Sequence, residues 1–126
     1  MTGLRIIAGS LKGRRLATPD WEGVRPTSDK LRETLFNVVA AQVGEARVLD
    51  GFAGTGAVGI EAISRGAAHV TFIDRDRRAV DLIAQNLARC AVLDGYAIVR
   101  ADLGSEIHRI RPAANFDLIF LDPPYD

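Results

Sequence analysis

The sequence has little cysteine, no long apolar run and no net excess of either charge, and each shortage excludes a class of protein. With one cysteine, Cys90, the chain cannot form an intramolecular disulfide, which excludes a scaffold held by its own disulfides. No apolar run reaches the roughly 18 residues that span a bilayer. The opening residues, MTGLRIIAGS, lack the apolar stretch of a secretory signal. We therefore expect a cytoplasmic protein without a membrane partner or bound metal, and a small core or surface thiol at Cys90.

The residues that are present suit one folded domain over 1–126. Of the 126 residues, 48% are hydrophobic and 25% are charged, as in a soluble domain with a modest core. The net charge of zero hides an asymmetry: residues 1–32 hold seven Lys and Arg against three acids, and residues 33–126 hold nine against thirteen. A basic N-terminal region is expected if that region meets a polyanion, but an ordinary solvated surface explains the charges equally well.

The first third of the chain predicts a hairpin followed by a helix. The stretches LRIIAG and RRLATP read as two short strands around a glycine-containing turn, a basic hairpin over residues 4–18. The stretch DWEGVRP after it reads as a loop. Apolar residues at helical spacing predict a helix over 27–43, capped by Thr27 or Ser28 and ended by Gly44.

From residue 46 onward, predicted strands and helices alternate. Near-continuous apolar strands separated by amphipathic helices indicate an α/β fold, a parallel sheet with helices on both faces. We predict strands at 46–50, 69–74, 97–102 and 116–122, helices at 56–65 and 77–90, and a short helical turn at 105–110. Residues 46–126 should therefore form a single core.

A glycine-rich stretch follows the first strand of this core. VLDGFAGTGAVG contains Gly54, Gly56 and Gly59 at the G-x-G-x-x-G spacing of dinucleotide sites, although that match alone is weak. In a nicotinamide site the first glycine follows the strand closely, whereas here Asp50 ends the predicted strand and three residues intervene. A carboxylate at that point would repel a pyrophosphate but suits a ligand with a cationic amino group. S-adenosylmethionine (SAM) is such a ligand, and we expect it as the cofactor.

Three further acids end the later predicted strands. Asp74 lies 18 positions after Gly56, near the roughly 20-residue offset of a ribose-binding carboxylate. Asp102 stands where it could accept a hydrogen bond from an adenine amine, and Asp122 ends the fourth strand. Because ligands of open α/β sheets bind beyond the carboxyl ends of the strands, all four acids would line one rim. A helix cap or a loop role explains any one of them equally well, but four in register favour a site.

The fourth predicted strand runs into the tetrapeptide Asp122-Pro123-Pro124-Tyr125. The prolines fix φ and remove two backbone donors, so the turn presents acceptors. An amine on an aromatic base is a poor nucleophile, because its lone pair is delocalised into the ring. The Asp122 carboxylate and the Pro123 carbonyl could hold its two hydrogens and turn the lone pair toward an electrophile, with Tyr125 stacked on the base. A flipped-out nucleotide fits such a pocket, and a plain proline-bounded turn is the alternative.

Four stretches together resemble the bacterial 16S ribosomal RNA guanine-N2-methyltransferases: RIIAGSLKGRRL, RPTSDKLRETLFNVV, VLDGFAGTGAVGIEAISRGA and DPPYD. The resemblance covers essentially the whole chain. Its specific part is N-terminal, because the glycine-rich stretch is shared by many SAM enzymes and DPPY also occurs in DNA adenine-N6 methyltransferases. It implies a Rossmann-like SAM-dependent methyltransferase fold and methylation of the N2 amine of a guanine in small-subunit ribosomal RNA, naked or in the ribosomal particle.

The resemblance also implies roles for individual residues. Asp50, Gly54 and Gly56 would hold the methionine end of SAM, Asp74 its ribose and Asp102 its adenine. Further residues expected at the cofactor site are Gly51, Phe52, Thr55, Arg75 and Leu103. Residues expected to hold the guanine are Asp122, Pro123, Pro124 and Tyr125. Residues expected to contact ribosomal RNA are Lys12, Arg14, Arg15 and Arg25.

The chain departs from the family pattern in two residues and in its extent. Gly51 replaces a bulky apolar residue, which should loosen the loop, and Asp74 stands where Glu is common. The family's later strand–helix units do not follow the DPPY strand, so the predicted strand 116–122 would be an apolar sheet edge, open to self-association. We therefore expect a fragment, or a chain that needs a partner, which binds SAM but transfers methyl groups slowly or not at all.

Three alternative functions stay open. A DNA adenine-N6 methyltransferase would prefer duplex DNA to structured RNA. A nicotinamide-dependent oxidoreductase would bind NADH and would give DPPY no role. A non-catalytic fragment would bind SAM or RNA without methyl transfer.

Overall fold

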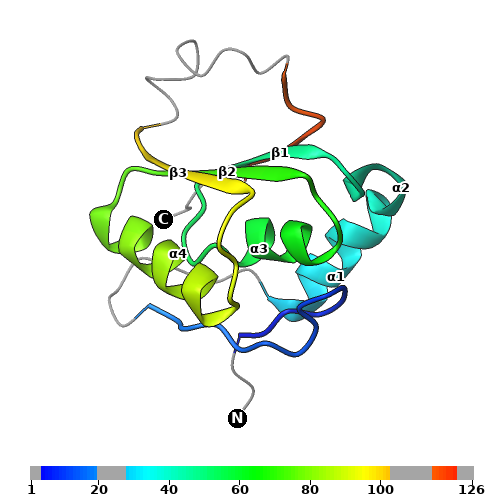
Figure 1. Ribbon diagram of the computed structural model, residues 1–126, viewed down its shortest axis with the longest axis horizontal. Coiled ribbons are helices and arrows are strands. Elements are labelled where there is room, and N and C mark those ends of the chain that lie inside the picture. Colours follow the sequence, from blue (N-terminus) through cyan, green and yellow to red (C-terminus); the bar gives the residue numbers. More distant parts are fainter. Residues whose placement is uncertain (1–3, 20–27, 103–114, 122–126) are drawn as a thin grey trace.

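The computed structural model describes residues 4–19, 28–102 and 115–121, and these contain a four-stranded sheet (Figure 1). All pairings in the sheet are parallel and the strand order is β3-β2-β1-β4, which confirms the predicted parallel sheet. Three strands differ from their predicted bounds: β1 is shifted by one residue to 47–51, β3 spans 96–100 rather than 97–102, and β4 starts at 118 rather than 116. The strands are β1 (Arg47–Gly51), β2 (His69–Asp74), β3 (Tyr96–Arg100) and β4 (Leu118–Leu121).

The described helices lie together below the sheet in Figure 1. The prediction placed helices on both faces of the sheet. The predicted turn at 105–110 lies outside the described residues, and the helices that the structure describes lie on one face. The predicted helix 27–43 is two helices, because the backbone of Val39 leaves the helical region, with φ −104° and ψ 17°. Ser28 caps the first of them, since its hydroxyl accepts a hydrogen bond from Leu31 N at 3.1 Å. The helices are α1 (Asp29–Val38), α2 (Ala40–Val43), α3 (Ala57–Ser64) and α4 (Arg77–Arg89).

The main apolar core lies between the sheet and these helices. Val48, Val70 and Phe72 of the strands are completely buried, as are Ile60 of α3 and Ile83 of α4. Cys90, at the end of α4, is buried in this core, so of the two predicted places for its thiol, core or surface, the core is confirmed. Burial raises the pKa of the Cys90 thiol. No helix in the described part of the chain is long and apolar enough to cross a bilayer.

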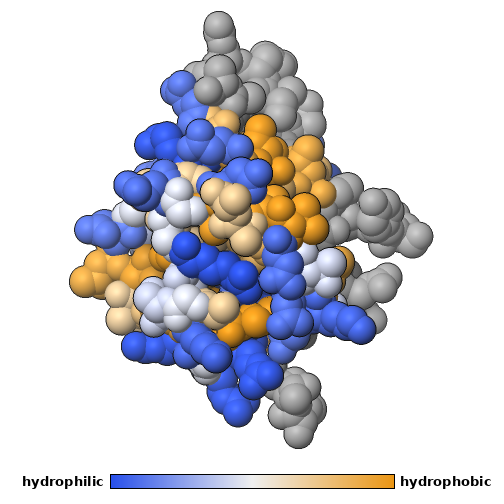
Figure 2. Space-filling view, turned by 90° about the vertical axis from the view of Figure 1, so that its right-hand side faces the viewer, coloured by the Kyte–Doolittle hydropathy of each residue, from blue (hydrophilic) through white to orange (hydrophobic). Residues whose placement is uncertain are grey.

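Within the described residues, β4 forms one edge of the sheet, as predicted. Phe120 is buried, whereas Ile119 and Leu121 are 44% and 55% exposed. On the face shown in Figure 2, apolar surface gathers toward the upper end, the sheet end of the molecule, and smaller patches below are separated by hydrophilic side chains. The described part of the sheet thus ends in an apolar strand.

Residues 4–19, which we call the basic segment, run beneath the helices on the side away from the sheet (Figure 1). The predicted hairpin is antiparallel but has only one bridge, between Arg5 and Arg15, in place of two regular strands. Positive φ angles at Gly9 and Gly13 curl the chain, and the Ile7 and Ala8 N–H groups just before this turn bond to the Glu61 side chain of α3. Leu4, Ile6 and Leu16 are buried in the main core; the basic segment is therefore docked onto the helices through apolar and polar contacts.

Candidate functional site

The chain between β1 and α3, residues 51–56, forms a tight loop that we call the glycine loop. Its backbone has positive φ angles at Phe52 (62°), Gly54 (57°) and Gly56 (83°). A left-handed conformation at a bulky residue such as Phe52 costs free energy, and such strain concentrates at functional sites. Ala53 N donates to Ile73 O at 2.8 Å, which fixes the loop against the end of β2. The loop is thus a defined structure at the carboxyl ends of two neighbouring strands.

The two acids predicted at these strand ends hold this loop and the helix that follows it. Asp50, which is 4% exposed, accepts a hydrogen bond from Gly59 N in the first turn of α3 at 3.0 Å. Its negative charge therefore stands at the positive end of the helix dipole. Asp74 accepts from Gly54 N and from Asp76 N, one bond to each carboxylate oxygen, both at 2.9 Å. Asp74 thus holds the glycine loop and Asp50 the start of α3, roles that sequence reasoning did not assign to them.

The third glycine of the spacing brings α3 close to the sheet. A Cβ at Gly59 would lie 2.2 Å from Cε1 of Phe72, so only glycine allows this approach. Gly56 is left-handed and packs near Ile83 of α4. Thr55 is buried, and its hydroxyl accepts from Ala57 N at 3.1 Å. The glycine loop is therefore supported by α3, α4 and β2 together.

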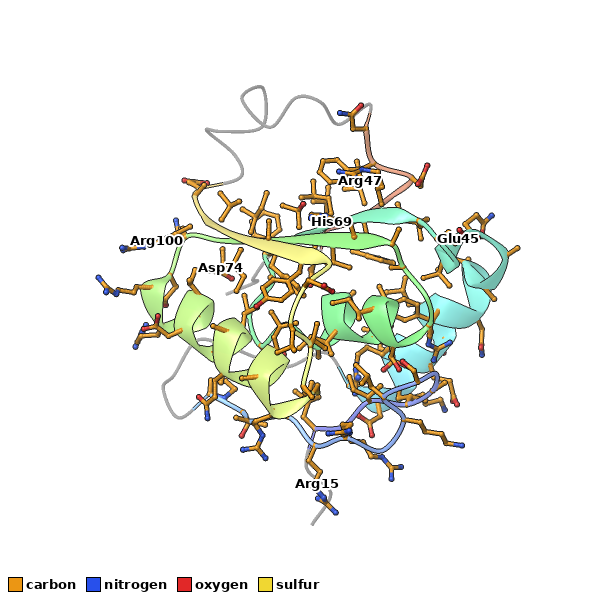
Figure 3. The ribbon with its side chains drawn as sticks, viewed as in Figure 1. Arg15, Glu45, Arg47, His69, Asp74 and Arg100 are labelled. Atoms are coloured by element: carbon orange, nitrogen blue, oxygen red, sulfur yellow. The ribbon has the colours of Figure 1, made fainter. Side chains whose placement is uncertain are left out.

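The third predicted acid, Asp102, does not end a strand. β3 stops at Arg100, which pairs in register with Asp74, and Asp102 is an exposed residue two positions further on. The two strand ends contact each other just before it: Ala101 N donates to Asp74 O at 3.1 Å, and Arg100 Nε donates to Arg75 O at 3.2 Å. Figure 3 shows Asp74 and Arg100 at the same end of the sheet. The ends of β2 and β3 are thus joined beside the glycine loop.

The other predicted site residues divide into two groups. Lys12, Arg14 and Arg15 are exposed on the basic segment, and Figure 3 shows Arg15 at the side of the molecule opposite the sheet. The remaining predicted residues, which lie outside the described residues, are Arg25, Leu103, Asp122, Pro123, Pro124 and Tyr125. In the described ranges, no group of three or more His, Cys, Asp or Glu side chains is arranged to hold a metal ion.

Sequence reasoning missed the buried polar side chains that hold the basic segment. Glu61 of α3 is fully buried; its carboxylate accepts hydrogen bonds from Ile7 N at 2.9 Å and Ala8 N at 3.0 Å. It also forms ion pairs with fully buried Arg32 at 3.1 Å and with Arg65 at 2.9 Å. One side chain therefore joins the basic segment, α1 and the end of α3.

Two more polar side chains complete this attachment. The Ser64 hydroxyl donates to Ala8 O and accepts from Leu11 N, and Asn86 of α4 bonds to the backbone of Ala17. A usable signal was present in the sequence: Glu61, Ser64 and Asn86 lie on helix faces that are otherwise apolar. A buried polar group needs a partner, so each should have been expected to bind another segment.

Asp76 begins α4 beside this site. Its side chain caps the helix by accepting from Arg78 N at 2.8 Å, and the Arg78 guanidinium contacts the same carboxylate at 2.9 Å. These bonds from Arg78, first of all the one from its side chain, lower the pKa of Asp76. The cap fixes the start of the helix that supports the glycine loop.

Comparisons with known proteins agree with this architecture. The family model described as conserved hypothetical protein 95 matches residues 4–126. The ribosomal RNA small subunit methyltransferases D of Haemophilus influenzae and Escherichia coli K12 are each 39% identical over 97% of this chain. The chain spans 64% and 60% of the length of these two relatives.

Solved structures agree as well. A hypothetical protein of Thermus thermophilus, 32% identical, matches with a TM-score of 0.83 over 96% of this chain and 69% of its own. The protein SMU.776, solved in complex with SAH (S-adenosylhomocysteine), matches with a TM-score of 0.64 over 75% of this chain and 25% of its own. Its identity is 24%, so this second likeness concerns the fold alone.

Proposed function

This chain belongs to the family described as conserved hypothetical protein 95, the family of the small-subunit ribosomal RNA methyltransferases D, and from that premise we propose that the protein methylates small-subunit ribosomal RNA with SAM as methyl donor. The acceptor we propose is the N2 amine of a guanine. Because the chain spans less than two thirds of the length of those relatives, the activity is proposed for the complete protein.

The observation that carries the proposal is a pair of carboxylates at the ends of β1 and β2: Asp74 holds the glycine loop through Gly54 N, and Asp50 holds the start of α3 through Gly59 N. Asp50 and Asp74 put negative charge beside the loop, where a pyrophosphate would be repelled. A carboxylate has about four acceptor positions, so Asp74 retains capacity for ribose hydroxyls after its two backbone bonds. These groups fit the cationic methionine end and the ribose of SAM, which supplies an electrophilic methyl group when bound. Phe52, Thr55 and the three glycines of the loop (Gly51, Gly54 and Gly56) would surround that end of the ligand.

The base would be held by the DPPY residues, which lie outside the described residues. In this proposal the Asp122 carboxylate and the Pro123 carbonyl accept the two hydrogens of the guanine amine, and Tyr125 stacks on the ring. Holding the amine in line with the methyl group is worth several kcal/mol. Asp122→Ala should abolish methyl transfer in the complete protein while leaving SAM affinity nearly unchanged. Loss of SAM binding in that variant would contradict the division of roles.

Ribosomal RNA would be bound by the basic segment. Replacing Lys12, Arg14 and Arg15 by Ala should weaken RNA binding and flatten its salt dependence, by roughly 0.7–0.9 of a slope unit per lost phosphate contact. As a control, exposed Arg47 and Arg77 lie outside the segment, and their replacement should leave the slope unchanged. Equal slopes for the triple variant and the parent would show that the three cations are only solvated surface.

Calorimetric titration tests the cofactor assignment without RNA. SAM and SAH should bind, and NADH should not. Asp74→Ala should lower SAM affinity by about 1–3 kcal/mol, because ribose hydroxyls and the Gly54 N–H lose an acceptor. Asp81→Ala, an exposed acid on α4, is the control and should bind as the parent does. Unchanged SAM affinity in Asp74→Ala, or NADH binding tighter than SAM, would exclude the assignment.

A further inference from the structure

A single buried side chain, Asn86 of α4, touches both the basic segment and the glycine loop. Its Oδ1 accepts a hydrogen bond from Ala17 N at 2.6 Å, and its Nδ2 donates to Ala17 O at 3.1 Å. The same Nδ2 donates to Thr55 O at 2.9 Å. Asn86 is 0% exposed, and its bond to Thr55 O is fully buried, whereas Ala17 is half-buried. The two segments that it joins are 69 and 31 residues away from it in the sequence.

The geometry leaves this amide little freedom. An asparagine amide has two donors and one acceptor oxygen, and here both donors and the oxygen are engaged. Because the group is buried, moving Ala17 away would leave polar atoms unpaired at a cost well above that of an exposed hydrogen bond. Ile83, one turn earlier on the same face of α4, packs near Gly56, so α4 contacts two neighbouring positions of the glycine loop. Asn86 therefore contacts both a carbonyl of the loop and the backbone of Ala17.

Among the described residues, the other hydrogen bonds from helix side chains to the basic segment do not also reach the glycine loop. Ser64, in the last turn of α3, holds Ala8 and Leu11 by its hydroxyl, and its carbonyl accepts from Ser10 N. Ser64 is 4% exposed, similar in burial to Asn86. It thus provides a matched comparison: both side chains hold the basic segment, but Asn86 also binds a carbonyl of the glycine loop.

We propose that Asn86 is a positioning residue that couples the two binding functions, so that SAM or SAH in the glycine loop strengthens RNA binding by the basic segment, and RNA strengthens SAM binding equally. This inference rests on the proposed function. In this proposal the bound ligand orders the glycine loop and so fixes Thr55 O. The Asn86 amide is then fixed by its bond to Thr55 O, and Ala17 by its two bonds to Asn86. Reciprocity is required by linkage, and coupling between two sites in proteins is typically about 5- to 150-fold.

The experiment measures the dissociation constant of SAH alone and with saturating 16S ribosomal RNA. In the parent chain, RNA should tighten SAH binding about fivefold or more. In Asn86→Ala the ratio should fall to about one. In Asn86→Asp the ratio should also fall to about one. This variant keeps an acceptor for Ala17 N but places a carboxylate oxygen against the carbonyls of Ala17 and Thr55. Ser64→Ala should retain the parent ratio. A parent ratio of one, or an unchanged ratio in a folded Asn86→Ala protein, would overturn the proposal.

Hydrogen exchange on the parent chain gives a second readout that needs neither a variant nor RNA. SAH should slow exchange at the Ala17 amide, which is bonded to Asn86, more than at the Leu11 amide, which is bonded to Ser64. Equal effects at both amides would overturn the coupling even if every Asn86 variant failed to fold. Absence of SAH binding would instead contradict the proposed function, and SAH binding without RNA binding would contradict only its RNA part.

Discussion

The strand–helix core and the basic segment are held in place by different kinds of contact. In the core, β1, β2 and β3 pair residue by residue over continuous ladders, and apolar side chains fill the space beneath them. The basic segment has one antiparallel bridge, and much of its backbone bonds to Glu61, Ser64 and Asn86. A ladder distributes its stability over many equivalent bonds, whereas the segment depends on a few side chains. Single substitutions should therefore affect the two regions differently.

The largest effect is expected at Glu61. Replacing Glu61 by Ala removes the partner of fully buried Arg32 and leaves Ile7 N and Ala8 N without their acceptor. Breaking a buried ion pair in this way typically costs about 3–5 kcal/mol, so the free energy of unfolding should fall by that amount in chemical denaturation. Exposed Glu33 on α1 is the matched control, and Glu33→Ala should change stability by less than about 0.5 kcal/mol. A loss below about 1 kcal/mol in Glu61→Ala would show that Glu61 contributes little to holding the segment.

A core contact should give an intermediate effect. In Gly59→Ala the new Cβ would meet the Phe72 ring at 2.2 Å, and overpacking of this kind costs about 1–3 kcal/mol, partly offset by the better helix propensity of alanine. Gly44→Ala is the control, since a Cβ there meets nothing within 4 Å. Thermal denaturation of the two variants should separate them clearly. Equal stability of both would mean that α3 can move from the sheet at little cost.

The smallest effect is expected at the cap of α4. Asp76→Ala removes the side-chain acceptor for Arg78 N and should cost about 1 kcal/mol, whereas Asp81→Ala, inside the same helix, should cost less. Because the pKa of folded Asp76 is lowered from its ordinary value of 3.8, its contribution is present above that pH and is lost as the pH falls below it. The stability difference between the parent and Asp76→Ala should therefore shrink in acid. A difference that stays constant down to strongly acidic pH would contradict the capping role.

The core was predictable because its pattern is repetitive and local. Apolar strands and amphipathic helices gave β2 its observed bounds and placed α4 within one residue. The helix break at Val39 was not predictable, because the apolar spacing continues across it. The acids Asp50 and Asp74 were predicted beside the glycine loop, but their bonds to Gly59 N of α3 and to Gly54 N of the loop depend on the folded backbone.

The attachment of the basic segment could not be predicted from local pattern. The Glu61 and Asn86 bonds join residues 53–54 and 69 positions apart, and no periodicity carries information about such pairs. A polar residue on an apolar helix face indicates that a partner exists, but not which segment supplies it. The predicted hairpin was only partly correct: the Ile6 and Leu16 N–H groups bond across it, whereas those of Ile7 and Ala8 bond to Glu61.

Residue-resolved hydrogen exchange of the parent and Glu61→Gln tests this account most directly. The glutamine keeps the shape of the side chain but loses its charge and one acceptor. The account predicts that the Ile7 and Ala8 amides lose protection in the variant, while the Leu49 amide of β1 and the Phe72 amide of β2 keep theirs. Loss of protection by the same factor in all four amides, or continued protection of Ile7 and Ala8, would contradict the claim that one buried carboxylate holds the basic segment independently of the sheet.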